Sequence, residues 1–415
     1  MISRTIIRPL ILCSVLSSLG GVASAASVKI ALVETLSGPQ ASTGMTYRDA
    51  ARYEINKLNA GGGWNGEPIK LLEYDNQGTP AGAAEKLKAA IADGAQMVIQ
   101  GASSAIAGQL SEDIRKYDIR NPGKEVLYLN VGAEAMDLTG SKCHFHAFRF
   151  ISNAQINVKA LVAAMKAAHV LGTRVYSINQ NYSWGVDMQQ AIEDDAATGG
   201  YKVVGKTLHD VNKIQDFSPY VAKIAAAHPD TVITGNWSND LLLLMKAAKS
   251  GGLKARFATT FMDQPGNLAN AGSVALGAYV VHPFDAEAGG KKSEAFSADF
   301  KAKVGHYPVF VEPQTVFGLA MVGAALKKVR PENGKLNVNK LAEAIEKTKI
   351  ETPMGEWSMR AADHQALLPM VVSVVSKDAK YKVDGTDMGF TPVKLLTAAE
   401  AATPAQKTCK MKRPA

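Results

Sequence analysis

The sequence predicts an α/β protein built from two domains of mostly parallel sheet. Short apolar runs alternate with amphipathic segments of helical periodicity along most of the chain, as in successive βαβ units. The length of 415 residues is sufficient for two separate hydrophobic cores. Aromatic residues make up only 7% of a chain rich in Ala and Gly. This composition favours packed α/β layers over a β-sandwich.

The expected elements follow one another in regular order. The strands are 28–35, 69–74, 97–99, 126–131, 174–178, 202–208, 231–234, 255–260 and 277–281, with more strands within 354–376. The helices are 46–59, 81–93, one through 106–114, 157–169, 187–197, 217–227, one after 238, 293–304, 315–329 and 338–348. Strands joined by helices predict a parallel sheet with right-handed crossovers. The tail beyond Thr403 has no regular pattern.

The N-terminus has the pattern of a secretory signal peptide. Arg4 and Arg8 precede a short apolar stretch, and Ala23-Ser24-Ala25 supplies the small residues of a cleavage site. We therefore expect residues 1–25 to be removed and the mature protein to be soluble in the periplasm. Cys13 follows the bulky Leu12, which disfavours a lipid-attachment site.

The charge balance excludes no small-molecule function but gives little support to nucleic-acid binding. Of the 46 Lys and Arg, two lie in the signal peptide, which leaves 44 against 38 acidic residues. These charges are scattered rather than gathered in a basic tract. We expect no nucleic-acid partner, and at most a weak steering field for anionic solutes.

Export would leave two cysteines, Cys143 and Cys409, in an oxidising compartment. We expect them to form a disulfide that ties the tail to the body of the protein, and the alternative is two separate thiols. The run Cys143-His144-Phe145-His146 has the spacing of metal ligands. No second ligand cluster accompanies it and its alternation is typical of a strand, so we expect no metal.

The strand at 97–99 ends at Gly101 and leads into a helix that begins near Ser103 and Ser104. Ligands of α/β folds bind where the carboxyl end of a strand meets a helix N-terminus. Backbone N–H groups and serine hydroxyls there suit a carboxylate, although either serine could instead only cap the helix. Other strand ends carry hydroxyls, amides and aromatic rings. No dinucleotide fingerprint, phosphate loop, nucleophile elbow or zinc-protease motif occurs, which favours a binding cleft over an exported hydrolase.

A series of short motifs resembles one known family over nearly the whole mature chain. The motifs are Leu36-Ser37-Gly38-Pro39 with Gly44, residues 55–62, Asn65-Gly66, Asp75-Asn76, Ser104, Leu138-Thr139 with Phe148-Arg149, Tyr182-Ser183-Trp184-Gly185 and Asp216-Phe217-Ser218. In this order and spacing they resemble the periplasmic solute-binding proteins of branched-chain amino acid ABC transporters.

The resemblance implies two doubly wound parallel-sheet lobes joined by three crossing segments, with the solute bound between them. The implied boundaries are 26–151 and 283–353 for the first lobe, 152–282 and 354–395 for the second, and 396–415 for a tail. It also implies a monomeric protein that is not an enzyme, needs no cofactor and delivers a small-molecule solute to ABC permease subunits. A sensing receptor of the same fold, not coupled to transport, is the alternative.

The resemblance further implies a set of ligand-binding residues. The hydroxyl of Ser104, next to Ser103, and the 132–134 backbone would hold a carboxylate. Together with Ser103 and Ser104, the full set consists of Thr43, Gly132, Ala133, Glu134, Tyr182, Trp184, Trp237 and Asp263. Trp184 and Trp237 could instead belong to the core, Tyr182 could face outward, and Asp263 could cap a helix rather than receive an amino group.

Two residues depart from the family pattern. Glu134 replaces a small or hydroxyl-bearing residue, and Trp184 replaces Tyr or Phe. These departures leave the solute open, as an amino acid or another carboxylate-bearing compound, an aromatic acid included. We expect His364 to satisfy a hydrogen bond in a crossing segment rather than to touch the solute.

Overall fold

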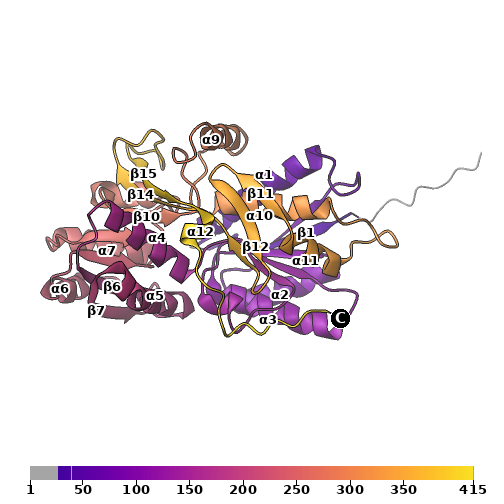
Figure 1. Cartoon of the computed structure of the whole chain (residues 1–415), viewed down its shortest axis with the longest axis horizontal. Coiled ribbons are helices and arrows are strands. Elements are labelled where there is room, and N and C mark those ends of the chain that lie inside the picture. The colour runs from indigo at the N-terminus through magenta and orange to yellow at the C-terminus, as the bar shows by residue number, and fades with distance from the viewer. Residues whose placement is uncertain (1–26, 39, 415) are drawn as a thin grey trace, which may run out of the picture.

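The structure is a computed structural model and describes residues 27–38 and 40–414. Its elements form two α/β lobes side by side along the long axis of the molecule (Figure 1). The predicted fold class is therefore confirmed. The expected signal peptide, its cleavage site and Cys13 lie outside the described residues.

Lobe 1 is built on an eight-stranded sheet of order β11-β12-β13-β5-β4-β3-β1-β2. Its strands are β1 (Lys29–Glu34), β2 (Lys70–Asp75), β3 (Met97–Gln100), β4 (Leu127–Asn130), β5 (Ala147–Arg149), β11 (Lys349–Thr352), β12 (Gly355–Arg360) and β13 (Gln365–Leu367). Its helices are α1 (Ala41–Ala60), α2 (Pro80–Ala92), α3 (Ser104–Arg120), α9 (Lys291–Val304), α10 (Glu312–Leu326) and α11 (Val338–Glu346), with the 3-10 turn η1 (Met136–Thr139). Strands β1 to β5 are parallel.

Lobe 2 is built on a seven-stranded sheet of order β15-β14-β10-β9-β8-β6-β7. Its strands are β6 (Arg174–Gln180), β7 (Lys202–His209), β8 (Thr231–Thr234), β9 (Arg256–Thr259), β10 (Tyr279–His282), β14 (Met370–Ser376) and β15 (Gly389–Leu396). Its helices are α4 (Ala154–Ala167), α5 (Ser183–Gly199), α6 (Ser218–Ala226), α7 (Ser238–Ser250), α8 (Asn267–Ala271) and α12 (Ala398–Ala401), with the 3-10 turn η2 (Gly272–Ala275). Only β14 and β15 run antiparallel to their neighbours.

The central strands are buried along their whole length because helices cover both faces of each sheet. Every residue of β3, β4 and β8 is buried, and their sequences are correspondingly apolar rather than alternating. Helix ends follow local capping rules. Thr79 accepts a hydrogen bond of 3.0 Å from Gly82 N–H, and Pro80 then occupies the first turn of α2.

The chain crosses between the lobes after β5, after β10 and between Leu367 and Met370. The last crossing differs from the expected boundary at 353/354, which is wrong. Strands β12 and β13 pair with each other, and Gln365 pairs with Arg149 of β5, so both strands belong to lobe 1. The sequence indicates that 354–376 is extended but contains no signal for which sheet its strands join.

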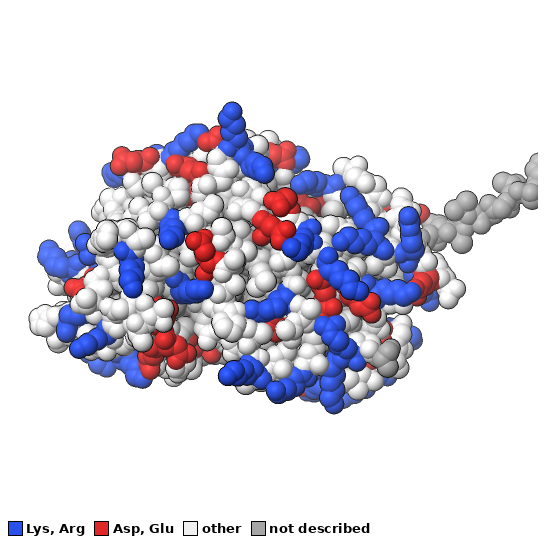
Figure 2. Space-filling view, viewed as in Figure 1, with Lys and Arg blue, Asp and Glu red and all other residues white. Residues whose placement is uncertain are grey.

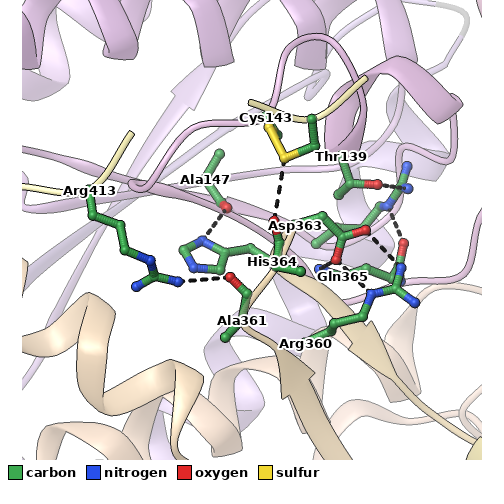
Figure 3. Close-up of a disulfide and its surroundings, with 12 residues drawn as sticks. Thr139, Cys143, Ala147, Arg360, Ala361, Asp363, His364, Gln365 and Arg413 are labelled. Carbon is green, nitrogen blue, oxygen red and sulfur yellow. Dashed lines mark hydrogen bonds and ion pairs between the residues drawn. A yellow bond between two sulfur atoms is a disulfide. The ribbon is translucent and has the colours of Figure 1, made fainter. Parts of the chain in front are cut away.

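The C-terminal tail leaves lobe 2 after β15 and runs back along lobe 1 (Figure 1). There Cys409 forms the predicted disulfide with Cys143, with a Cα–Cα distance of 5.5 Å. Beside this disulfide, Arg413 donates a hydrogen bond to the Ala361 carbonyl (Figure 3). Arg413 also donates to the Glu346 carboxylate. The prediction of a bridged tail is confirmed.

Basic and acidic side chains are interleaved over both lobes on the face shown in Figure 2, without a continuous basic band. Within the described part of the chain, no helix has the length and apolar character needed to cross a bilayer.

Candidate functional site

A cavity of about 370 Å³ lies between the two lobes, at the carboxyl ends of the central strands. Eight of the ten expected ligand-binding residues line it: Thr43, Ser104, Gly132, Ala133, Glu134, Tyr182, Trp184 and Trp237. Six further residues line it that the sequence analysis did not select: Tyr47, Gly101, Ala102, Phe261, Gln264 and Phe310. Ser103 and Asp263 do not line this cavity.

Ser104 and Ser103 have different roles although they are adjacent. Ser104 is buried at the first position of α3, and its Oγ accepts a hydrogen bond of 3.3 Å from Ala135 N–H. This bond orients the Ser104 hydroxyl and leaves its proton for an acceptor in the cavity. Ser103 occupies the N-cap position but its side chain makes no capping bond. The simple capping alternative is therefore not observed for either serine.

The backbone N–H groups next to Ser104 already have an acceptor within the protein. The fully buried carboxylate of Glu34 accepts from Gly101 N–H at 2.9 Å and from Ala102 N–H at 3.2 Å. Burial raises the pKa of Glu34 to about 7, against the opposing effect of these donors. The expectation that the N–H groups at this strand end await a ligand carboxylate is therefore wrong for these two. No pattern in the sequence indicates that a side chain from β1 reaches them.

Glu134 is the charged residue of the cavity wall. Its Oε1 accepts hydrogen bonds from Ser152 Oγ at 2.8 Å and from Asn157 Nδ2 at 3.1 Å, whereas its Oε2 has no partner. Burial raises the pKa of Glu134 to about 7. A carboxylate with one satisfied and one free oxygen in a buried cavity is suited to bind a donor-rich or cationic group.

The aromatic wall comes from lobe 2. Trp184 Nε1 donates to the Gly235 carbonyl at 2.8 Å, and Trp237 Nε1 donates to Tyr182 Oη at 2.9 Å. These bonds fix the two indoles while their rings remain part of the cavity lining. Both tryptophans are therefore cavity residues as well as members of the hydrophobic core. Tyr182 also faces the cavity rather than solvent.

Further hydrogen bonds join the lobes across this region, in addition to the one from Asn157 of α4 to Glu134. Gln264 Nε2 of lobe 2 donates to Thr43 Oγ1 of lobe 1 at 2.8 Å, and Gln264 Oε1 accepts from Ser238 N–H at 3.0 Å. Nearby, Met136 N–H of lobe 1 donates to Asp187 Oδ2 of α5 at 2.7 Å. The lobes thus contact each other directly over the cavity.

Asp263 lies behind the cavity, in contact with His282. Its Oδ2 is 3.2 Å from His282 Nδ1, and helix α8 is capped by Gly266 instead, so the capping alternative for Asp263 is wrong. His282 Nε2 in turn lies 3.0 Å from Ser373 Oγ. This series has the connectivity of a catalytic triad. Ser373, however, is fully buried, lines none of the cavities described here and donates a hydrogen bond to Asp285 rather than to His282.

The histidines singled out in the sequence serve structural contacts. His144 Nε2 bonds to Ser111 Oγ at 3.1 Å, and His146 Nδ1 pairs with Asp118 at 2.9 Å. His364 satisfies hydrogen bonds rather than touching the solute cavity, as expected: one ring nitrogen bonds to the Ala147 carbonyl (Figure 3) and the other to Glu346. Across residues 27–38 and 40–414, no group of His, Cys, Asp and Glu is arranged to hold a metal ion.

Of the cavity residues that the sequence analysis did not select, Tyr47 is the one that a sequence pattern indicates most clearly. It lies four positions after Thr43 on α1, so helical spacing alone places the two on one face. Its ring packs so closely against Gly101 and Gly132 that a Cβ added at either would lie 2.5 or 1.9 Å from a Tyr47 atom. Phe261, Gln264 and Phe310 lie in loops with no periodic pattern, and nothing in the sequence singled them out.

Comparisons with known proteins agree with this architecture. The model of the periplasmic binding protein family matches residues 27–380. The Leu/Ile/Val-binding protein homolog 4 of Brucella abortus is 61% identical over 403 residues, 97% of each chain. The leucine-, isoleucine-, valine-, threonine-, and alanine-binding protein of Pseudomonas aeruginosa is 28% identical over 343 residues, 80% of this chain and 85% of its own.

Among solved structures, the leucine-, isoleucine-, valine-, threonine-, and alanine-binding protein of Brucella ovis, in a closed conformation, superimposes with a TM-score of 0.92. It is 62% identical to this chain and covers 94% of it, and all of the Brucella chain is matched. Fold, sequence and cavity therefore agree, and the chain belongs to the periplasmic binding protein family, whose members bind ligands and are not enzymes.

Proposed function

We propose that this protein is the exported receptor of an ABC importer that captures a small carboxylate-bearing solute between its lobes. The receptor acts in the periplasm as a monomer after cleavage behind Ala25, and it delivers the solute to a membrane permease. The carboxylate lies against the Ser104 hydroxyl, and the aromatic wall of Trp184 and Trp237 contacts the rest of the solute. Hinge closure buries it, as in periplasmic binding proteins generally.

The observation that carries the proposal is the cavity between the lobes, lined by residues of both. A solute held there contacts Ser104 of lobe 1 and Trp184 of lobe 2 at once, so it stabilises the closed arrangement over an open one. The names of the relatives from Brucella and Pseudomonas support an amino acid as the solute class.

Mass spectrometry of the solute that copurifies with the exported protein tests this function. A panel of amino acids and aromatic acids, measured by calorimetry after removal of that solute, then ranks the candidates. Small-angle scattering should show a more compact particle with saturating solute. A protein that binds no carboxylate-bearing compound, or keeps identical dimensions with and without its solute, contradicts the proposal.

A further inference from the structure

The cavity between the lobes continues into a second space at the hinge, here called the inner compartment. It has a volume of about 300 Å³ and shares Gly132, Glu134, Phe261 and Phe310 with the main cavity. Beyond these shared residues, it is lined by apolar residues at the crossing segments and at the start of α10, and by five polar side chains: Ser152, Thr260, Asp263, His282 and Gln314. Phe261 and Phe310 contact each other edge to face, with ring centroids 6.0 Å apart, and form part of the wall that the two spaces share.

Four buried oxygen atoms on the inner compartment have no hydrogen-bond partner. They are Glu134 Oε2, Thr260 Oγ1, Asp263 Oδ1 and Gln314 Oε1, on residues between 2 and 6% exposed. Buried polar atoms without partners are costly, and each of these belongs to a residue that lines the inner compartment. Hydroxyl and amide groups can donate or accept, but an ionised carboxylate only accepts. Glu134 and Asp263 therefore favour a positively charged ligand group over a negatively charged one.

His282 lines the inner compartment and pairs with Asp263, whereas Glu134 Oε2 has no partner. The Ser373 hydroxyl donates its hydrogen bond to Asp285, so its oxygen must accept a hydrogen bond from His282 Nε2. The contact between His282 Nδ1 and Asp263 Oδ2 then holds one further proton, which makes that pair neutral at most and leaves Asp285 and Glu134 in addition.

Arg149 lies in the same buried region but is directed elsewhere. Its guanidinium donates to Gln365 Oε1 at 2.7 Å, to the Ala135 carbonyl at 2.5 Å and to Thr139 Oγ1. None of these bonds reaches Glu134 Oε2 or Asp263 Oδ1. The inner compartment thus offers acceptor atoms without partners, and the acids Glu134, Asp263 and Asp285 in and behind its wall outnumber the one cationic side chain that contacts them within the described residues, His282.

We propose that the inner compartment receives a cationic group at the far end of the solute, a guanidinium in the simplest case. The solute class is then a basic amino acid or related guanidino compound rather than an aliphatic amino acid. This inference rests on the proposed function, because it concerns the same solute. A guanidinium carries five donors in one plane, which suits acceptors on four different residues, and its flat face suits an aromatic ring of the shared wall such as Phe261 or Phe310.

The test compares probes that differ only in the far-end charge. Arginine and its neutral counterpart citrulline are titrated by calorimetry into the full mature protein, with leucine and agmatine as further probes. We expect arginine to bind at least tenfold more tightly than citrulline and leucine. Asp263→Asn should reduce the ratio of arginine to citrulline affinity several-fold. Because the readout is a ratio on one protein, a general loss of stability does not imitate it, and Glu134→Gln repeats the test if Asp263→Asn fails to fold.

The outcomes separate this inference from the proposed function. Equal affinities for arginine and citrulline, or leucine binding as tightly as arginine, overturn the cationic compartment while leaving a carboxylate receptor intact. Failure of both arginine and agmatine to bind also overturns it. Agmatine has no carboxylate, so tight binding of agmatine with no binding of citrulline or leucine supports the compartment and contradicts the carboxylate half of the proposed function.

Discussion

Gln264 and Thr43 form a hydrogen bond of 2.8 Å that spans the two lobes over the solute cavity. Both side chains are buried, and the side-chain amide oxygen of Gln264 accepts a hydrogen bond from Ser238 N–H. This bond can exist only when the lobes are together, so it stabilises the closed arrangement without requiring any contact with solute.

Removal of this bond should weaken solute binding. A neutral hydrogen bond contributes roughly 0.5–1.5 kcal/mol, so Thr43→Val should raise the Kd by about two- to tenfold. Thr43→Ser keeps the hydroxyl and is the matched control, with affinity close to the parent protein. Calorimetry measures both. If the Val and Ser variants bind equally, the inter-lobe bond does not contribute to closure.

Ser104→Ala should weaken binding of a carboxylate-bearing solute far more than Ser103→Ala. A hydrogen bond to a charged group contributes roughly 1.5–3 kcal/mol, which corresponds to a loss of about ten- to a hundredfold. Ser103 is the natural control because it is adjacent, lies outside the cavity lining and makes no capping bond. Calorimetry with the copurified solute should separate the two variants, and equal affinities would show that the anion is held elsewhere.

The contrast between these serines shows how far sequence reasoning reaches. Apolar runs and helical spacing predict that β3 leads into α3, and the fold class then places this junction at a ligand site. Periodicity cannot decide which of two adjacent hydroxyls enters the cavity, because that depends on the rotation of the first helical turn. Nor can it show that Glu34, from another strand, binds the neighbouring N–H groups, since this is a contact over 67 residues of chain.

Strand pairing sets a similar limit. The alternation in 354–376 predicts strands, but their sheet is decided by pairing partners such as Arg149 and Gln365, which are distant in sequence. Phe310 has a positive φ of 56° in the loop before α10, a conformation with no sequence signature at an aromatic residue. Such loop residues reach the cavity through tertiary packing alone. The disulfide was predictable because only two cysteines follow the signal sequence.

Loss of the disulfide between Cys143 and Cys409 should destabilise the protein. In the chain-entropy model a disulfide over a long loop contributes about 2–4 kcal/mol, so Cys143→Ser with Cys409→Ser should lower the denaturant midpoint clearly. Arg413→Ala is the control, because it keeps the disulfide and removes the hydrogen bond to the Ala361 carbonyl and the ion pair with Glu346, in which the Arg side chain is 47% exposed. A pair this exposed contributes roughly 0.2–1 kcal/mol. Free thiols that alkylate readily in the folded parent protein would contradict the bond.

Solute binding should change tryptophan fluorescence through two of the four tryptophans. Trp184 and Trp237 line the cavity, whereas Trp357 is fully buried in lobe 1 and does not. Trp184→Phe and Trp237→Phe should each reduce the solute-induced change, and Trp357→Phe should preserve it. Fluorescence titration measures this. A double Trp184→Phe, Trp237→Phe variant that keeps the full signal change would place the solute away from the aromatic wall.

Glu134 should make the stability of the solute-free protein depend on pH. Burial raises the pKa of its carboxyl group to about 7 in the folded protein, against 4.5 for an unperturbed Glu. Between these values the folded state retains a proton that the unfolded state releases. The free energy of unfolding therefore falls as pH rises through this window, by up to about 1.4 kcal/mol per pH unit for one group, and levels off above the folded pKa.

Glu134→Gln isolates this contribution from that of the other buried acids, such as Glu34, because the amide has nearly the same shape and does not titrate. Its oxygen can still accept from Ser152 and Asn157, so the local hydrogen bonds are kept. Urea unfolding of both proteins at pH 5, 6 and 7 should show that the free energy of unfolding declines less with pH in Glu134→Gln than in the parent protein. The difference in free energy of unfolding in favour of the parent protein should therefore shrink as pH approaches 7. Parallel declines in the two proteins would mean that Glu134 is ionised throughout, so that its cavity-facing oxygen carries a full negative charge already at pH 5.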